Sequence, residues 1–203
     1  MKKLLLITVL GLLAAGCTRT QIHQRYDKVD QATIGYIAGS LGRDLSSPPL
    51  AGYQLSICDT TGKGVAGLNY LTMTALKLGD PKIEEPDYNG DAFVVAVPAG
   101  DYRICRSTLS DKLGDRRFYF DKLTIPLKIE AGKVNYIGRY AGTSTTIAGL
   151  FGPVVDNAYW VVTDNQVRDM PAILMKMTLV SGLPVVTAIP AQNDFLLSVF
   201  QRR

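Results

Sequence analysis

The stretch Leu123-Thr-Ile-Pro-Leu-Lys-Ile-Glu130 places four aliphatic residues at every second position, with Thr, Pro, Lys and Glu between them. Successive side chains of a β-strand point to opposite faces, so this pattern predicts a strand with one apolar and one polar face. Such a strand packs one face on a core and leaves the other in water. Pro126 lies on the polar parity and cannot donate to a β-ladder, which predicts an edge strand or a bulge.

The same period of two recurs along most of the chain. Two connections, Val97-Pro-Ala-Gly-Asp-Tyr102 and Ile129-Glu-Ala-Gly-Lys-Val134, place Ala-Gly between strand patterns, as tight hairpins prefer. Many short strands separated by turn signals predict a mainly β protein with an antiparallel β-sandwich. The expected strands cover residues 33–40, 53–59, 65–77, 91–97, 101–107, 118–129, 133–140 and 159–163.

Helical signals are confined to the last third of the chain. Thr163-Asp164 can cap a turn that runs through Val167, and Asp169 can cap a second turn that begins near Met170-Pro171. Proline fits only the first turn of a helix, so one unbroken helix over 164–177 is not expected. The pattern predicts one or two short helices, then strand or extended chain over 180–190, and a terminal helix or docked tail over 193–200.

The N-terminus has the order of an export signal. Lys2 and Lys3 precede an apolar run over residues 4–15, and Gly16-Cys17 follow it. The run has about twelve residues, whereas a stable membrane-spanning helix takes roughly twenty. We therefore expect residues 1–16 to be a cleaved signal peptide and not a permanent membrane anchor.

The segment Leu13-Ala-Ala-Gly-Cys17 resembles the lipobox of bacterial lipoproteins, with Ala14 where that class most often has Leu. The resemblance implies that Cys17 carries a diacylglycerol and becomes the acylated first residue. Several acyl chains anchor a protein stably to a membrane surface. Thr18 follows the cysteine, where Asp favours inner-membrane retention, so the resemblance implies the outer membrane and its periplasmic face. Exposure to the exterior, or an ordinary secreted protein with a chance cysteine, stays an alternative.

Residues 17–32 are polar with little apolar periodicity and are expected to form a lipidated tether. Residues 33–203 then form the β-sandwich domain with a C-terminal helical or extended appendage. Loss of Lys2 and Lys3 with the signal leaves 187 residues and lowers the formal charge from +4 to +2. A chain of this length buries a core without help from a metal, and the low charge does not indicate a nucleic-acid partner.

The other two cysteines, Cys58 and Cys105, are expected to form a disulfide. The apolar residues of 53–59 share one strand face and leave Cys58 on the other face, and those of 101–106 likewise leave Cys105 opposite. Both thiols therefore lie on the polar sides of their strands. Exported proteins fold in an oxidising compartment, where disulfides persist. Two unpaired thiols are the alternative.

Catalytic and metal-binding patterns are sparse. His23 is the single histidine and lies in the expected tether, so a Ser-His-Asp or Cys-His arrangement has no base. Zinc ligation would depend on carboxylates and on two cysteines expected to be paired. The sequence therefore predicts no catalytic residue, no metal site and no cofactor.

The acidic segment Asp87-Tyr-Asn-Gly-Asp91 has a superficial likeness to a calcium loop. Its glycine is at the fourth position instead of the sixth, and Pro98 stands at the twelfth in place of Glu. We expect a solvated acidic turn, with Glu84 and Glu85 just before it.

Two further stretches are candidates for binding. The weakly polar segment Gly142–Gly152 is a flap, a partner-binding edge or a strand interrupted by glycines. The segment Arg116–Phe120 combines two arginines with three aromatic residues and could bind an anionic glycan, a lipid headgroup or nucleic acid. Strand alternation would instead bury some of its rings.

The segments Pro98–Arg103 and Ala131–Tyr140 resemble hairpins of uncharacterised bacterial envelope lipoproteins with transthyretin-like or immunoglobulin-like domains, over residues 90–140. The anchor, the tether and the expected sandwich favour a non-enzymatic binding or scaffold lipoprotein that contacts an envelope protein. The alternative is a carbohydrate- or peptidoglycan-binding module, or a hydrolase that uses paired carboxylates. Its candidate acids are Glu84, Glu85, Asp87 and Asp91, and such a reaction needs two acids at a set separation across a cleft.

Overall fold

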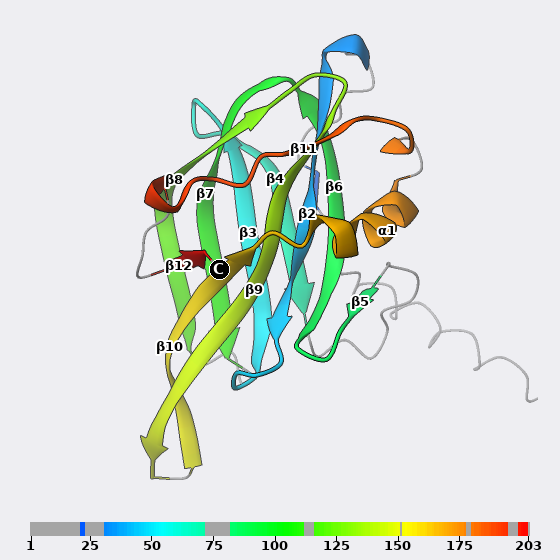
Figure 1. Cartoon of the computed structure of the whole chain (residues 1–203). Coiled ribbons are helices and arrows are strands. Elements are labelled where there is room, and N and C mark those ends of the chain that lie inside the picture. The colour runs from blue at the N-terminus through cyan, green and yellow to red at the C-terminus, as the bar shows by residue number, and fades with distance from the viewer. Residues whose placement is uncertain are drawn as a thin grey trace, which may run out of the picture.

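The computed structural model describes residues 21–22, 31–71, 82–111, 116–150, 152–177, 180–194 and 199–202. In this part the chain is mainly β, with two sheets packed face to face and one α-helix in the C-terminal third (Figure 1). The predicted β-sandwich with a short helix is confirmed. The expected signal peptide, Cys17 and His23 lie outside the described residues.

The first sheet has the strand order β1-β4-β3-β7-β8, and every neighbouring pair is antiparallel. The two residues of β1 come from the expected tether and pair with Ala66 and Gly67. The strands are β1 (Gln21–Ile22), β3 (Leu50–Asp59), β4 (Gly64–Leu71), β7 (Gly100–Asp111) and β8 (Arg117–Ile129).

Strand β8 contains residues 123–129 of the alternating stretch and behaves as its pattern predicts. Its four aliphatic side chains are buried, and Pro126 between them is exposed. The strand lies at the edge of the sheet and its register against β7 shifts between Ile104 and Arg106. The proline is tolerated because an edge strand leaves half of its backbone donors outside the ladder.

The second sheet has the order β12-β10-β9-β2-β6-β5, with β11 beside β9. It is mixed and not purely antiparallel, because β2 pairs with β9, and β10 with β12, in parallel. The chain between β2 and β9 crosses the other sheet, and a connection of that length permits parallel pairing. The strands are β2 (Ile34–Asp44), β5 (Lys82–Glu84), β6 (Tyr88–Pro98), β9 (Val134–Gly149), β10 (Gly152–Thr163), β11 (Val185–Thr187) and β12 (Phe200–Arg202). Short 3-10 helices cover Gln31–Thr33 and Gln192–Asp194.

The main core fills the space between the sheets. Trp160 of β10 is fully buried at its centre, with the rings of Tyr53 and Tyr140 edge-on to it. The indole Nε1 donates to the Ser107 hydroxyl on the opposite sheet, so the polar atom of the ring keeps a partner. This contact joins the two layers.

Helix α1 (Gln166–Lys176) covers the outer face of the second sheet and runs unbroken through Pro171, so the expected interruption is wrong. Asp169 lies inside the helix and is fully buried, instead of capping a second turn. Burial of Ala172 and Ile173 and the ionic contacts of Asp169 offset the hydrogen bond that the proline removes. With 11 residues, α1 falls short of a membrane span, and no other described helix has the length and apolar content for one.

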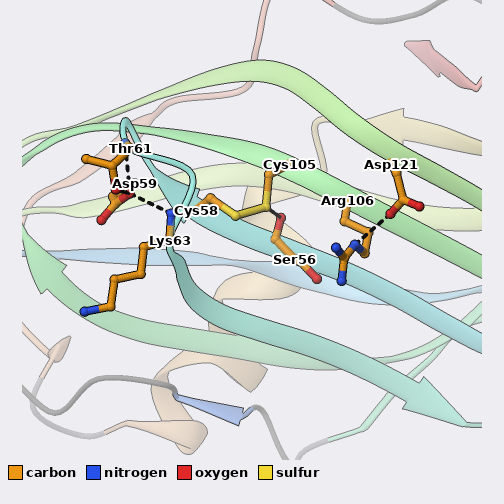
Figure 2. The surroundings of a disulfide bond; sticks show 8 residues. All are labelled: Ser56, Cys58, Asp59, Thr61, Lys63, Cys105, Arg106 and Asp121. Atoms are coloured by element: carbon orange, nitrogen blue, oxygen red, sulfur yellow. Dashed lines mark hydrogen bonds and ion pairs between the residues drawn. A yellow bond between two sulfur atoms is a disulfide. The ribbon is translucent and has the colours of Figure 1, made fainter.

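The disulfide between Cys58 on β3 and Cys105 on β7 is present, with a Cα–Cα distance of 5.8 Å (Figure 2). Both residues lie on the outer face of the first sheet, opposite Leu55, Ile57 and Ile104 in the core, as their strand parity predicted. The bond joins two adjacent strands across 47 residues of sequence.

Candidate functional site

The β9–β10 hairpin extends beyond the body of the second sheet (Figure 1). Pairing of β2 with β9 ends at Gly142, and β12 pairs only with residues 160–162 of β10. Residues 143–149 and 152–159 therefore form a two-stranded ribbon that no other described strand borders. Thr143, Ser144 and Ala158 at its base are buried, so about five residues of each arm project, or roughly 17 Å at about 3.3 Å per residue. The sequence expectation for these strands ended at residue 140 and resumed at residue 159, so it missed this ribbon.

The far part of the ribbon is apolar and exposed. Ile147 on β9 is 53% exposed, and Leu150 in the turn is 93% exposed. Along β10 an open pocket of about 330 Å³ is lined mostly by apolar groups: Pro48, Pro49, Asp111, Thr146, Pro153, Val154 and Val155. Contiguous exposed apolar surface marks an interaction site in many soluble proteins.

Hydrogen bonds hold the ribbon to the end of β2, to the loop after it and to Arg116, which directly precedes β8. The Ser144 hydroxyl donates to the carbonyl oxygen of Pro48 at 2.8 Å, and the Thr143 hydroxyl donates to an Asp44 carboxylate oxygen at 3.1 Å. On the other arm, Arg116 Nη1 donates to the Val155 carbonyl oxygen at 2.7 Å. The ribbon is thus fixed in one direction, which lowers the entropy that a partner must remove on binding.

The ribbon can accept another strand. Each arm has one edge bonded to the other arm and one edge that no described strand occupies. Unpaired backbone N–H and C=O groups on such an edge are a template for strand addition, and neighbouring apolar pockets select the added side chains. Of the three alternatives for residues 142–152, the structure shows the strand interrupted by glycines, because β9 runs through to Gly149 and β10 begins at Gly152.

The four candidate acids do not form a pair across a cleft. Glu84 and Asp87 are exposed, whereas Asp91 is buried. Glu85 accepts hydrogen bonds from Arg139 at 2.6 and 3.1 Å, and these bonds lower the pKa of its carboxyl. A general acid needs the opposite shift. No three His, Cys, Asp or Glu side chains gather at one point in the described residues.

A buried ionic network under α1 was missed by the sequence reasoning. Arg139 on β9 bridges Glu85 and Asp169, and its guanidinium lies 4.3 Å from the centroid of the Tyr88 ring. The hydroxyls of Ser40 and Tyr136 donate to Asp169 at 2.6 and 2.8 Å. Burial raises the pKa of Tyr136 and keeps it a neutral donor. Arg139 lies in a long strand and Asp169 lies in a helix, so no local sequence pattern predicts that these two residues form a pair.

A small pocket of about 260 Å³ adjoins this network. Its wall includes the acidic residues Asp44 and Asp87 together with Tyr88, Arg139 and Asn165. Asp44 is engaged by the N–H and hydroxyl of Ser46 at 2.8 and 2.6 Å, and Arg139 by its two acidic partners. Asp44 and Arg139 therefore already have protein partners, whereas the buried Tyr88 hydroxyl has no hydrogen-bond partner among the described residues.

The basic and aromatic residues of 116–120 are divided between the two faces of β8. Phe118 and Phe120 pack against the core, as strand alternation predicts. Tyr119 is exposed, and its hydroxyl accepts from Arg117 at 3.2 Å, while Arg116 is bound to Val155. The segment does not present its three rings as one surface.

The chain matches no protein-family model and no curated protein. It is similar to a solved structure of a leucine-rich repeat protein from Bacteroides thetaiotaomicron VPI-5482, with 13% sequence identity and a TM-score of 0.31. The similarity covers 66% of this chain and 14% of that protein, so the chain corresponds to a small part of its length. A TM-score of this size carries no argument about fold or function.

Proposed function

We propose that this chain is a non-enzymatic binding module, held by acyl chains on Cys17 at the periplasmic face of the outer membrane, which docks an envelope protein through the β9–β10 hairpin. The observation that carries the proposal is the two-stranded ribbon with Ile147 and Leu150 exposed and both outer edges free of described strands. A monomer gains no core from these groups, whereas a partner would bury them.

The partner surface that fits the ribbon is an extended apolar strand. Backbone groups along the edge of β10 would pair with it, apart from the Val155 carbonyl that Arg116 already occupies, and aliphatic side chains would enter the pocket lined by Pro153, Val154 and Val155. The residues lining the pocket include one charged side chain, Asp111, so a neutral or weakly basic strand suits it best.

The location is supported by the sequence. The N-terminus has the order of a lipoprotein signal: Lys2 and Lys3, then the apolar run 4–15, then Cys17. The Cys58–Cys105 bond agrees with an oxidising compartment such as the periplasm. The intact mass of membrane-extracted protein tests the anchor: we expect a triacylated Cys17 in the wild type and an unprocessed or soluble chain for Cys17→Ala. A mature chain without lipid in both would contradict the anchor.

Docking is tested by a photo-crosslinking residue at position 150 in intact cells. We expect a reproducible adduct of one mass there, and none from the same group at Lys128, which is exposed on the other sheet. The identified partner, once purified, should bind the wild-type chain. Its affinity for Leu150→Asp should be at least about tenfold lower, because burial of one leucine side chain contributes about 1.5 kcal/mol or more to binding. Equal affinity for both chains, or adducts that do not differ between the two positions, would contradict docking by the hairpin.

The second candidate is a module that binds carbohydrate or peptidoglycan at the pocket lined by Asp44, Asp87 and Arg139. The carboxylates and the guanidinium of this small pocket can accept from and donate to the hydroxyl groups of a sugar. Co-sedimentation with purified sacculi distinguishes the two candidates. Binding that falls for Asp87→Asn and is unchanged for Leu150→Asp would favour this candidate, and no co-sedimentation of wild type would exclude it.

A further inference from the structure

A second surface of interest lies on the outer face of the first sheet, around the disulfide (Figure 2). A pocket of about 390 Å³ opens there between the β3–β4 turn and strands β7 and β8. Its lining is Ser56, Cys58, Gly62, Gly64, Ala66, Arg103, Cys105, Arg106, Lys122, Leu123 and Thr124. Three of these side chains are cationic and none is acidic, so the pocket wall is positively charged.

The cations of this pocket are incompletely neutralised. Arg106 pairs with Asp121 at 2.7 Å, and both side chains are more than half exposed, so this ion pair is weak. Nε of Arg103 is buried and has no hydrogen-bond partner among the residues that the structure describes. A buried donor without an acceptor is unfavourable, and an anion in the pocket would satisfy it.

Two irregularities in the sheet create the pocket. The register between β3 and β7 shifts between Ser56 and Ile57, opposite Ile104 and Arg106, which leaves Cys105 as an extra residue. Opposite the same residue, β8 contributes extra residues between Asp121 and Ile125. Arg103, Arg106 and Lys122, which lie on either side of these bulges, line the same pocket. Bulges commonly re-aim side chains in this way.

The backbone of Lys122 supports a role for this side chain. Its φ is 63°, and it is the one described residue other than glycine in the left-handed region. A β-carbon makes that conformation unfavourable, and glycine would relieve it. Backbone strain of this kind collects at sites where a side chain is needed. The fold thus keeps a lysine where a glycine would stabilise it.

The turn after β3 leaves space for the same group of side chains. Gly62 has a φ of 90°, and a β-carbon there would lie 3.0 Å from Nη2 of Arg103. The Asp59 carboxylate in that turn accepts from the N–H and hydroxyl of Thr61 and from the Lys63 N–H, so it is held within its own turn (Figure 2). It makes no hydrogen bond to Nε of Arg103.

We propose that this pocket binds a phosphate group, carried by a phosphorylated sugar or by a phospholipid headgroup. Guanidinium groups donate two parallel hydrogen bonds to phosphate oxygens, and the lysine adds a point charge. Ser56 and Thr124, whose hydroxyls are further donors, also line the pocket. A phosphate monoester carries up to two negative charges and balances the two cations left after the Arg106–Asp121 pair, whereas a phosphodiester carries one and offers the same oxygen acceptors. The site is separate from the β9–β10 hairpin and does not depend on the docking proposal.

Calorimetric titration of the full chain in uncharged detergent with inorganic phosphate tests the proposal, against chloride at equal ionic strength. Lys122→Gly removes one cation while it relieves the backbone, so this variant keeps or raises its midpoint of thermal unfolding. We expect the Kd for phosphate to rise at least about tenfold for Lys122→Gly and for Arg103→Gln. Lys128→Gln on the same strand is the matched control and should keep the wild-type Kd, since it lies outside the pocket.

The same titration with glucose 6-phosphate and with glycerophosphoglycerol distinguishes the two sources. Tighter binding of the monoester would assign a sugar phosphate, and tighter binding of the diester would assign a lipid headgroup; either result supports the site. The proposal is overturned if wild type binds none of the three compounds. It is equally overturned if the folded Arg103→Gln and Lys122→Gly chains bind them as wild type does.

Discussion

The guanidinium of Arg139 on β9 bonds the carboxylate of Asp169 on α1, and the exposed fractions of the two side chains are 5% and 0%. The two residues are 30 positions apart and belong to different elements. Through this contact the one described α-helix is fixed to the second sheet by charge as well as by the apolar contacts of Ala172 and Ile173.

Asp169→Asn tests the weight of this contact. The amide leaves Arg139 with an uncompensated buried charge on one side, so we expect the free energy of unfolding to fall by about 3–5 kcal/mol. Urea denaturation measures it. Asp156→Asn makes the same chemical change at an exposed position of β10 and should shift the value by less than about 0.5 kcal/mol. Similar losses for both variants would show that the network does not stabilise the fold.

The stability of the protein should depend on Glu85 at acidic pH. Hydrogen bonds from Arg139 hold the pKa of Glu85 below its ordinary value of 4.5. The carboxylate is thus favoured in the folded chain, so its stabilisation is fully present above about pH 4.5 and is lost as the pH falls through the lower, folded-state pKa. Urea midpoints measured from about pH 7 to about pH 3 should decline, and Glu85→Gln should decline less steeply.

Part of the loss of stability at acidic pH is expected to remain in Glu85→Gln. The hydrogen bond from the Thr61 hydroxyl lowers the pKa of Asp59, so this carboxylate also stabilises the folded chain only above its folded-state pKa. Adding Asp59→Asn should remove a further share of the pH dependence. If wild type and Glu85→Gln lose stability in parallel over this range, the Arg139 contact does not act on that carboxyl.

The disulfide should stabilise the protein by restricting the unfolded chain. For a loop closed across 47 residues, the loop-entropy model gives about 4 kcal/mol. Cys58→Ser with Cys105→Ser should therefore lower the free energy of unfolding by about that amount, as measured in guanidinium chloride. Reductant should lower the wild-type value to that of the double variant and leave the double variant unchanged. A double variant as stable as the wild type would contradict this.

Gly142 marks the point where the hairpin leaves the sandwich and should not accept a side chain. A β-carbon there would lie 2.4 Å from Cδ1 of Tyr53 and 2.9 Å from Leu109, both in the core. Gly142→Ala should cost about 1–3 kcal/mol, because the Tyr53 ring must move within a packed interior. Thermal unfolding measures this. An unchanged midpoint would mean that the hairpin base adjusts without disturbing the core.

The strands of the sandwich could be predicted from the sequence because the signal for each is local. In the stretch 123–130 the alternation of aliphatic and polar residues is complete, and the structure buries its four aliphatic side chains. The outward direction of Cys58 and Cys105 followed from the same parity, and their bond is present. Strand limits were less exact: β9 continues nine residues past Tyr140, because pairing with β10 sustains a segment whose glycines and hydroxyl residues carry no alternation.

Helix α1 could not be predicted as one element, because its stability comes from elsewhere in the chain. Pro171 is a local signal against it, and the Asp169 contacts with Arg139, Tyr136 and Ser40 outweigh that signal. The pocket beside the disulfide is likewise absent from any sequence motif. It requires two bulges on separate strands to coincide, together with the left-handed backbone of Lys122.

The sequence by itself determined the class of fold and the face on which the residues of the alternating strands lie, because both depend on side chains only a few positions apart. The tertiary structure alone decided which charges are buried together, that the hairpin around Leu150 stands free of the sheet and that three cations line one pocket. Those features arise from contacts between residues distant in the chain, whose pairing depends on the packing of whole sheets.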